Sequence, residues 1–415
     1  MSQSNIQSSN AASVKKIAVI GSNLNGLIAA WNLGKRHNVS VFIEGNKPAG
    51  FGPISLYNGS HIEHTCTDFL PQQSPELVKI LHELKLDTQP HTSSCCISLS
   101  GQSINSRLNR NLQARPKRLL QLKFWQLAHT LYQLKNHPPR QQLSAKKWLD
   151  GLNINPHSLD EYIHPFAYAV CGQDWQNING HELWQQLLKH HHYRFQSPQW
   201  RTLKPGTTQI VHALCRQLQG QVFFNTKVIQ IIPQSAYAKV QLILQNAKPM
   251  QFDHVLIATS ATASLNLFSP TQHLITHMLN QVASSTEHSI LHRDSSVMPE
   301  RQELWANKHY QFTHSQQLNT HRWLEEQDKS GKPLFISTIN TKKNISQSAI
   351  IDAQHQQTTI ENQSTWNARR LLQTIQGHDQ LWFCANWTKP HRLATQAQHA
   401  LQIVNQIEQQ AIQCH

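Results

Sequence analysis

A segment of about 30 residues near the N-terminus constrains the fold more than any other part of the chain. Lys15–Ile20 is a short β-branched run bounded by Gly21, a pattern typical of a strand buried on both faces of a parallel sheet. Apolar residues then recur at helical spacing up to Gly34, which can cap a helix. His37–Glu44 has the pattern of a second strand that ends in an acid. This order of strand, glycine turn, helix, strand and carboxylate predicts a βαβ unit that binds a dinucleotide.

The turn Gly21–Gly26 departs from the G-x-G-x-x-G pattern at its second glycine, which is Asn23. The first glycine permits the tight turn, the second lets a pyrophosphate approach the backbone, and the third allows close helix–strand packing. An Asn side chain fills space that the phosphates would use. Two interpretations stay open: the Asn23 amide turns aside and donates a hydrogen bond to phosphate, or the turn belongs to a scaffold that has lost its cofactor.

Glu44 lies 18 residues after Gly26, close to the spacing of about 20 expected for the acid that binds the adenosine ribose. A carboxylate at this place disfavours a 2′-phosphate, so NADP would fit poorly. The alternative is a surface acid at the end of a strand.

Further short strands are predicted at 222–224, 228–232, 239–244, 252–259 and 380–385, followed by a C-terminal helix over about 394–410. Helix-rich stretches lie between these blocks. The layout indicates one nucleotide-binding domain interrupted by a second domain.

Composition limits the class of protein. With 39% hydrophobic residues in 415, the chain has enough apolar material for a large core. No run approaches the 18 apolar residues that cross a bilayer, and the polar N-terminus lacks a signal-peptide stretch. Seven cysteines without CxxC spacing favour reduced thiols and argue against a zinc site. We therefore expect a cytoplasmic protein with no bound metal.

The formal charge of +14 is concentrated in residues 88–149, which hold ten Lys or Arg and no acid. Within the basic 107–147 region, residues 116–132 have the pattern of a basic amphipathic helix. Three interpretations stay open: a core-packing helix with a solvated basic face, docking to the inner face of an anionic membrane, and nucleic-acid binding. The last is unlikely, since no nucleic-acid-binding signature accompanies the charge.

Other chemistry-bearing residues have simpler explanations. His190–His192 are adjacent on a predicted helix and point in different directions, so a solvated face is favoured over a metal site. Cys95 and Cys96 lack a low-pKa context and fit a buried pair. Asp160 and Glu161 near His164 are candidates for an acid and a base. Hydrolase and NTPase motifs are absent from the sequence.

The sequence resembles the flavin-containing amine oxidase and protoporphyrinogen oxidase superfamily, and especially its bacterial members described as NAD/FAD-binding proteins. The resemblance follows the chain in order through IAVIGSNLNGLIAAWNLGKRHNVSVFIEGNKPAGFG, Ile62–Asp87, Trp200–Gly206, Phe252–Thr259, Ile290–Asp294 with Trp305, and Leu381–Cys384.

The resemblance implies an α/β fold in which a Rossmann-like FAD-binding domain is interleaved with an α+β substrate domain. It places residues 13–90, 203–265 and 377–415 in the FAD-binding domain and residues 91–202 and 266–376 in the substrate domain, after a disordered leader over 1–12. The residues implied to contact FAD are Gly21, Ser22, Asn23, Gly26, Glu44, Gly50, Val228, Ala385 and Asn386.

The chain also departs from the family pattern at cofactor-facing positions. Besides Asn23, an Arg-x-Gly-Gly segment is Lys47–Gly50, an Asp-Thr-Gly segment is replaced around Glu63–Thr65, and a C-terminal glycine is Ala385. The implied function is an FAD-dependent oxidoreductase that takes a hydride from a hydrophobic substrate, such as an acyl chain or an amine. The alternative is a degenerate binding or scaffolding protein that has lost FAD and catalysis. No catalytic residue is assigned.

Overall fold

The protein is described by a computed structural model that covers residues 13–91, 93–99, 102–104, 122–140, 143–164, 166–167, 175–189, 199–203, 206–234, 239–312, 318–327, 331–338, 345–390 and 392–413. The chain divides into two compact units. Unit 1 comprises residues 1–50, 210–280 and 371–415, and unit 2 comprises residues 51–209 and 281–370. The boundaries expected from the sequence differ in detail: they group residues 51–90 with the nucleotide domain, and the division assigns them to unit 2.

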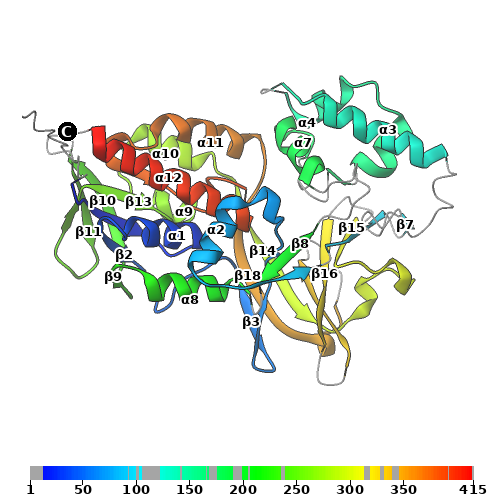
Figure 1. Cartoon of the computed structure of the whole chain (residues 1–415), viewed down its shortest axis with the longest axis horizontal. Helices are drawn as coiled ribbons and strands as arrows, with labels where there is room; N and C mark the ends of the chain where they lie inside the picture. Colours follow the sequence, from blue (N-terminus) through cyan, green and yellow to red (C-terminus); the bar gives the residue numbers. More distant parts are fainter. Residues whose placement is uncertain are drawn as a thin grey trace, which may run out of the picture. The chain divides into compact units, whose positions relative to one another are not determined.

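Unit 1 is built on a parallel five-stranded sheet with the order β19-β13-β1-β2-β9 (Figure 1). Its strands are β1 (Lys16–Ile20), β2 (Asn38–Phe42), β9 (Gly220–Phe223), β13 (His254–Ile257) and β19 (Leu381–Phe383). All four residues of β13 are buried, as are Ile17–Ile20 of β1. Strands buried on both faces form uninterrupted apolar runs, which explains the clarity of their sequence signal. The predicted βαβ unit and parallel sheet are confirmed.

Helix α1 (Leu24–Leu33) follows β1, and helix α12 (Leu393–Gln413) follows the last strand; the two helices pack side by side (Figure 1). Nine of the ten residues of α1 are buried, so this short helix is apolar almost all round. It ends at Gly34, as the sequence predicts. Gly34 has ordinary helical angles, but a Cβ there would lie 2.4 Å from the carbonyl oxygen of Gln219. Its role is therefore close approach to the chain before β9.

The rest of unit 1 is a small antiparallel sheet with short helices. The elements are β10 (Val228–Gln234), β11 (Lys239–Leu244), β12 (Met250–Phe252), α9 (Ala261–Leu265), α10 (His273–Asn280) and the 3₁₀ turn η9 (His378–Gln380). Helices α8 (Thr208–Gln217) and α11 (Gln363–Ile375) run across the division points in the chain.

Unit 2 contains a seven-stranded sheet with the order β18-β14-β17-β16-β15-β6-β7, in which only the β15–β6 pair is parallel among the described strands. Its strands are β6 (Cys95–Leu99), β7 (Gln102–Ile104), β14 (Ser284–His292), β15 (Lys308–Phe312), β16 (Leu318–Gln327), β17 (Pro333–Thr338) and β18 (Ile350–Thr359). Successive residues of a strand face opposite sides. Accordingly, Leu334 and Ile336 join one apolar cluster, and Phe335 joins another with Val297.

The remaining elements of unit 2 are two small β-pairs, several 3₁₀ turns and a group of helices. They are β3 (Ile54–Tyr57), β4 (Ser60–Glu63), η1 (Pro71–Gln73), α2 (Pro75–Glu83), β5 (Thr88–His91), α3 (Leu122–Asn136), α4 (Ala145–Asp150), α5 (Pro156–Ser158), η4 (Leu159–Ile163), α7 (Gly180–Lys189), β8 (Trp200–Leu203), η6 (Ser295–Val297), η7 (Gln302–Leu304) and η8 (Gln347–Ala349).

Helices α3, α4 and α7 share one apolar cluster, and we call the part of the chain from α3 to α7 the helical module (Figure 1). Helix α3 corresponds to the predicted basic amphipathic helix, and residues 116–121 lie outside the described residues. No described helix is both long and apolar enough to cross a membrane.

The contact of Gly34 with Gln219 gives a stability prediction. Gly34→Ala should lower the free energy of unfolding by about 1–3 kcal/mol, because the new methyl group would be forced against a backbone carbonyl oxygen. Urea unfolding of the purified chain measures the loss. The control is Gly45→Ala in the same unit, where a Cβ would meet only the Lys47 carbonyl oxygen at 3.8 Å. Equal stability of the two variants would contradict the close approach.

Candidate functional site

The glycine turn between β1 and α1 packs against the end of strand β13. Gly21 has φ +98°, and a Cβ there would lie 2.6 Å from the carbonyl oxygen of Ala258. A Cβ on Gly26 would lie 2.4 Å from the Cβ of the same alanine. Both positions therefore need glycine for the packing of β1 and α1, whatever the turn binds.

Asn23, the residue at the second glycine position, is the N-cap of helix α1. Its backbone is extended (φ −65°, ψ 164°), and its Oδ1 accepts a hydrogen bond from the amide of Gly26 at 3.0 Å. An Asn at this place satisfies one of the helix amides that have no partner within the helix. The side chain is 8% exposed, so the cap is covered by protein.

The segment after β2 lies along the same turn. The carbonyl oxygen of Gly50 accepts from the amide of Leu24 at 2.9 Å, and the amide of Gly50 donates to the carbonyl oxygen of Ser22 at 3.0 Å. The amide of Ala49 donates to Ser22 Oγ at 2.9 Å. The turn and this segment thus form a short parallel bridge between Asn23 and Gly50. The structure brings these predicted residues together, but they bond to one another.

A second amide network joins the turn to helix α12. Gln396 Nε2 donates to the carbonyl oxygens of Asn386, Lys389 and Pro390 at 3.4, 3.3 and 3.2 Å. Gln396 must then present its Oε1 to Asn25, and Asn25 donates to it through Nδ2. The Oδ1 atoms of Asn25 and Asn386 remain buried without a partner among the described residues. Both of these atoms are hydrogen-bond acceptors.

Glu44 and the region of Val228, which the family resemblance implies to contact the adenosine part of FAD, also lie close together. Glu44 follows β2, its side chain is 70% exposed, and it pairs with Lys227 Nζ at 2.7 Å. Lys227 directly precedes Val228, the first residue of β10. An exposed pair of this kind contributes at most about 1 kcal/mol, so Glu44 stays accessible. Ala385 and Asn386 follow β19 at the same edge of the parallel sheet, Ala385 being fully buried.

Comparison with known proteins decides the family. The sequence matches the family described as flavin containing amine oxidoreductase over residues 26–400. The chain belongs to this family. Its members are FAD-dependent oxidoreductases. No curated protein sequence matches the chain.

Solved structures of the same architecture cover nearly the whole chain. The conjugated-linoleic-acid-producing fatty acid isomerase from P. acnes is 12% identical, with a TM-score of 0.67 over 95% of this chain and 98% of that one. An oxidoreductase from Methanosarcina mazei is 15% identical, with a TM-score of 0.65 over 94% and 100%. Cyclohexylamine oxidase from Brevibacterium oxydans IH-35A is 12% identical, with a TM-score of 0.61 over 95% and 100%. At these identities the similarity establishes the fold, and it confirms the predicted fold class.

The residues of this flavin-family chain do not fit a pyrophosphate at the glycine turn. In dinucleotide folds the pyrophosphate lies at the N-terminus of the first helix and accepts from its free amides. Here the amides of Leu24 and Gly26 already donate to the chain's own oxygens. The Oδ1 atoms of Asn25 and Asn386, which lack a partner among the described residues, are acceptors and would repel phosphate oxygens. Only Gly21 and Gly26 of the three glycine positions are kept, and packing alone accounts for both.

The capping role of Asn23 gives a prediction that needs no ligand. Asn23→Ala should lower the free energy of unfolding by about 1 kcal/mol, because the amide of Gly26 loses its acceptor, whereas Asn23→Gly should cost only a few tenths. Asn23→Asp, which keeps an acceptor oxygen, serves as the control. Urea unfolding at neutral pH compares the variants, and an alanine variant as stable as wild type would show that the cap is not made.

In unit 2, the segment that replaces the family's Asp-Thr-Gly is held by the chain's own groups. Glu63 accepts from both the amide and the hydroxyl of Thr207. Burial raises the pKa of Glu63 despite these hydrogen bonds. Arg322 donates to the carbonyl oxygens of Glu63 and Thr65. Gly206, with φ +130°, leaves room for the Glu63 carboxyl group, since a Cβ there would come within 2.6 Å of it.

Two chains of buried hydrogen bonds run through the sheet of unit 2. In the first, the Ser55 hydroxyl donates its proton to Asp352 Oδ2 at 2.5 Å. Ser55 Oγ can then only accept from His64, so His64 carries its proton on Nε2. His64 Nδ1 accepts from the hydroxyl of Ser289. The proton of Ser55 is directed at a carboxylate and not at the imidazole. The group is therefore not arranged as a nucleophile with its base. The second chain runs from the amide of Asp294 through His292 and Ser337 to His321.

His64 and His292 are neutral because they are buried. Burial lowers the pKa of His64 and His292 from 6.5 to about 4, and it does the same for His254 in strand β13 of unit 1. His254 Nδ1 accepts from the indole of Trp382 at 3.3 Å. A buried polar network of this kind stabilises the fold only while each ring keeps the protonation state that its partners require.

The lowered pKa values predict a loss of stability in mild acid. As the pH falls from 6.5 towards 4, the unfolded chain binds protons that the folded histidines do not, at a cost approaching 1.4 kcal/mol per pH unit for each ring. The urea midpoint measured across this range should fall. His254→Asn, which keeps an acceptor near Trp382 but cannot be protonated, should reduce the slope. A slope equal to that of wild type would contradict the neutral state of His254.

The structure also shows a buried charged cluster for which the sequence gives no signal. Lys308 Nζ and His91 Nε2 lie 3.3 and 3.5 Å from the carboxylate oxygens of Asp68, and Cys66 donates its thiol proton to the same group. Burial opposes ionisation of Asp68, but Lys308 and His91 outweigh it and lower the pKa of Asp68. Cys66 and Asp68 likewise raise the pKa of Lys308 against the effect of burial. The cluster joins β15 to the segment after β4.

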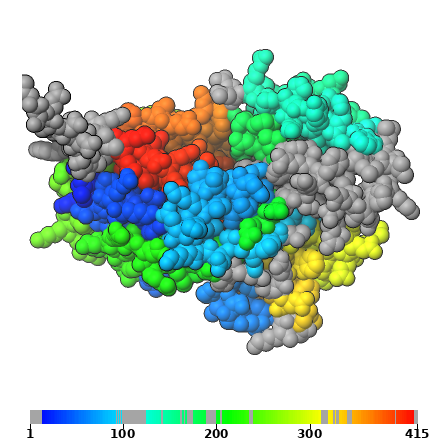
Figure 2. All heavy atoms as spheres, in the orientation of Figure 1, coloured from blue at the N-terminus to red at the C-terminus, as the bar shows by residue number. Residues whose placement is uncertain are grey.

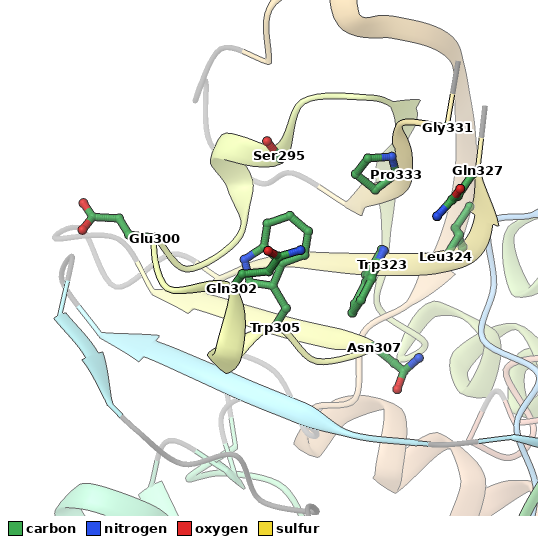
Figure 3. A pocket seen from close by; sticks show the side chains of 10 residues that line it. All are labelled: Ser295, Glu300, Gln302, Trp305, Asn307, Trp323, Leu324, Gln327, Gly331 and Pro333. Atoms are coloured by element: carbon green, nitrogen blue, oxygen red, sulfur yellow. The ribbon is translucent and has the colours of Figure 1, made fainter. Parts of the chain in front are cut away.

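A cavity of about 600 Å³ lies in unit 2 beside the tryptophans Trp305 and Trp323. The indole rings meet edge to face with centroids 5.4 Å apart, and Trp305 Nε1 donates to the carbonyl oxygen of Pro299 at 2.8 Å. Figure 3 shows the rings beside Gln302, with Glu300 pointing away from the other side chains. The lining residues are Ser295, Glu300, Gln302, Trp305, Asn307, Trp323, Leu324, Gln327, Gly331 and Pro333.

The other sequence candidates receive little support. Asp160 and His164 form an exposed pair at 3.2 Å on one helical turn, and neither lines the cavity beside Trp305 and Trp323. Cys96 is buried in β6, next to Cys95 in the chain. His190–His192 lie outside the described residues. Across the described ranges, no group of three His, Cys, Asp or Glu residues is placed to hold a metal ion.

Proposed function

We propose that this chain is a flavin-independent member of its family, a binding or scaffolding protein that keeps the fold of an FAD-dependent oxidoreductase without the cofactor. The proposal rests mainly on the residue at position 23 and on the contact that its side chain makes. There the glycine that would admit a pyrophosphate is an Asn whose side chain caps helix α1.

The three glycine positions of the motif serve different purposes, two for the packing of the fold and one for the cofactor. Gly21 and Gly26 are required by the contact with Ala258, so their presence says nothing about a ligand. The second glycine serves the approach of the pyrophosphate, and this is the position that has changed. This chain keeps the two glycines that packing demands and lacks the one that lets a pyrophosphate approach the backbone.

Opening the turn for a pyrophosphate would carry a cost. Asn23 must leave the amide of Gly26, at about 1 kcal/mol, and Gly50 must release the amide of Leu24, at about 1 kcal/mol more. Together these losses weaken binding about 30-fold. The steric conflict with the Asn23 side chain and the repulsion by buried acceptor oxygens add to this figure.

A binding role has a place in unit 2. The cavity beside Trp305 and Trp323 has a volume typical of small-molecule sites. Its aromatic wall is held in place, because Trp305 also packs edge to face on Phe335 with centroids 5.8 Å apart. The lining residues that the structure describes include one acid, Glu300, and no Lys or Arg. The aromatic wall favours a ring compound as the ligand.

The family's reaction is the competing function, and its signature is the flavin. We predict that the purified chain shows no visible flavin absorbance, either as isolated or after incubation with excess FAD and gel filtration. A stoichiometric flavin spectrum would overturn the proposal. Glu44→Ala extends the test: if flavin is present and this exposed substitution diminishes it, the family's ribose contact operates and the oxidoreductase function is supported.

A further inference from the structure

Helix α3 of the helical module has an aromatic outer face. Trp125 and Tyr132 are 55% and 64% exposed, and they lie seven residues apart, two helical turns along one side. His129, between them, is exposed as well. The opposite side of α3 is buried, with Leu131 and Leu134 in the apolar cluster of the module. Large aromatic side chains thus occupy the place where a solvated helix normally carries charges.

The charged residues of α3 and of the chain that follows it, up to residue 149, are all cations. Residues 122–149 contain five Lys or Arg and no Asp or Glu. Four of these cations are exposed in the structure, at Lys135, Arg140, Lys146 and Lys147. One of them, Lys146, pairs with Asp150 at 3.0 Å on the surface. Figure 2 shows the atoms of this region, coloured teal, at the surface of the molecule.

We propose that the outer face of helix α3 docks on the surface of an anionic lipid bilayer. Trp and Tyr have an apolar ring and a polar group, and they are enriched at the level of the lipid headgroups. Cations flanking such residues bind anionic headgroups, and together they hold a helix in the plane of the interface. This inference concerns a membrane surface and is independent of whether the chain binds flavin.

The combination of cations and exposed aromatic rings favours a lipid surface over a nucleic acid as the partner of α3. Binding to phosphate backbones depends on the cations and is lost steeply with salt. A bilayer uses the cations for attraction and the aromatic rings for insertion, so part of the binding survives salt. A partner bound by charge alone would not account for the two exposed rings of α3, Trp125 and Tyr132.

The test is flotation of the full chain with vesicles of phosphatidylglycerol and phosphatidylcholine, compared with phosphatidylcholine alone. We expect recovery with the anionic vesicles and little with the neutral ones. Trp125→Ser with Tyr132→Ser should reduce the bound fraction about tenfold, since the aromatic contribution is removed. The matched control is Phe224→Ser in unit 1, an aromatic residue that is 44% exposed and should not affect recovery.

A second pair of variants keeps the result decisive if the aromatic pair fails to fold. Arg140→Glu with Lys147→Glu reverses two exposed cations of the same module and should also release the chain from anionic vesicles. Equal recovery with neutral and anionic vesicles would overturn the proposal. So would a folded aromatic variant that floats like wild type, which would indicate electrostatic attraction alone, the behaviour expected of a nucleic-acid-binding surface.

Discussion

The contact of helix α1 with the end of strand β13 is the constraint on which unit 1 depends. Ala258 touches both Gly21 and Gly26, so the turn, the first helix and two central strands are fixed at one point. No side chain larger than hydrogen fits at either glycine. A chain under this constraint retains two glycines of a dinucleotide motif for reasons of packing. Their presence is evidence for the Rossmann-like fold and is neutral on the ligand.

Two amides at the start of helix α1, those of Leu24 and Gly26, have acceptors within the protein. Asn23 caps the helix, Gly50 takes the amide of Leu24, and Gln396 links Asn25 to the loop after β19. These contacts stabilise unit 1. The same principle holds in unit 2, where Arg322 and Thr207 fix the segment around Glu63.

The sequence predicts most of the fold because buried parallel strands and amphipathic helices leave periodic signals. Strand β1, helix α1 and helix α12 are found within a few residues of their expected bounds. The departure at Asn23 is visible in the sequence, but its consequence is not. Whether an Asn side chain turns towards a phosphate or onto the helix depends on three-dimensional contacts.

Other parts of the site escape sequence reasoning because their partners are far apart in the chain. Asn25 and Gln396 are separated by 371 positions, and no local pattern relates them. Asp68 and Lys308, which form a buried ion pair, carry no motif either. For the nine residues predicted to bind FAD, that role stays a prediction. The structure brings five of them together in hydrogen-bonded contact at the glycine turn: Gly21, Ser22, Asn23, Gly26 and Gly50. The central claim is that this chain does not bind FAD at the glycine turn, and equilibrium titration of the purified chain with FAD, followed by flavin fluorescence, tests it most directly. The structure predicts no saturable change in fluorescence. Saturable binding at one FAD per chain would contradict it.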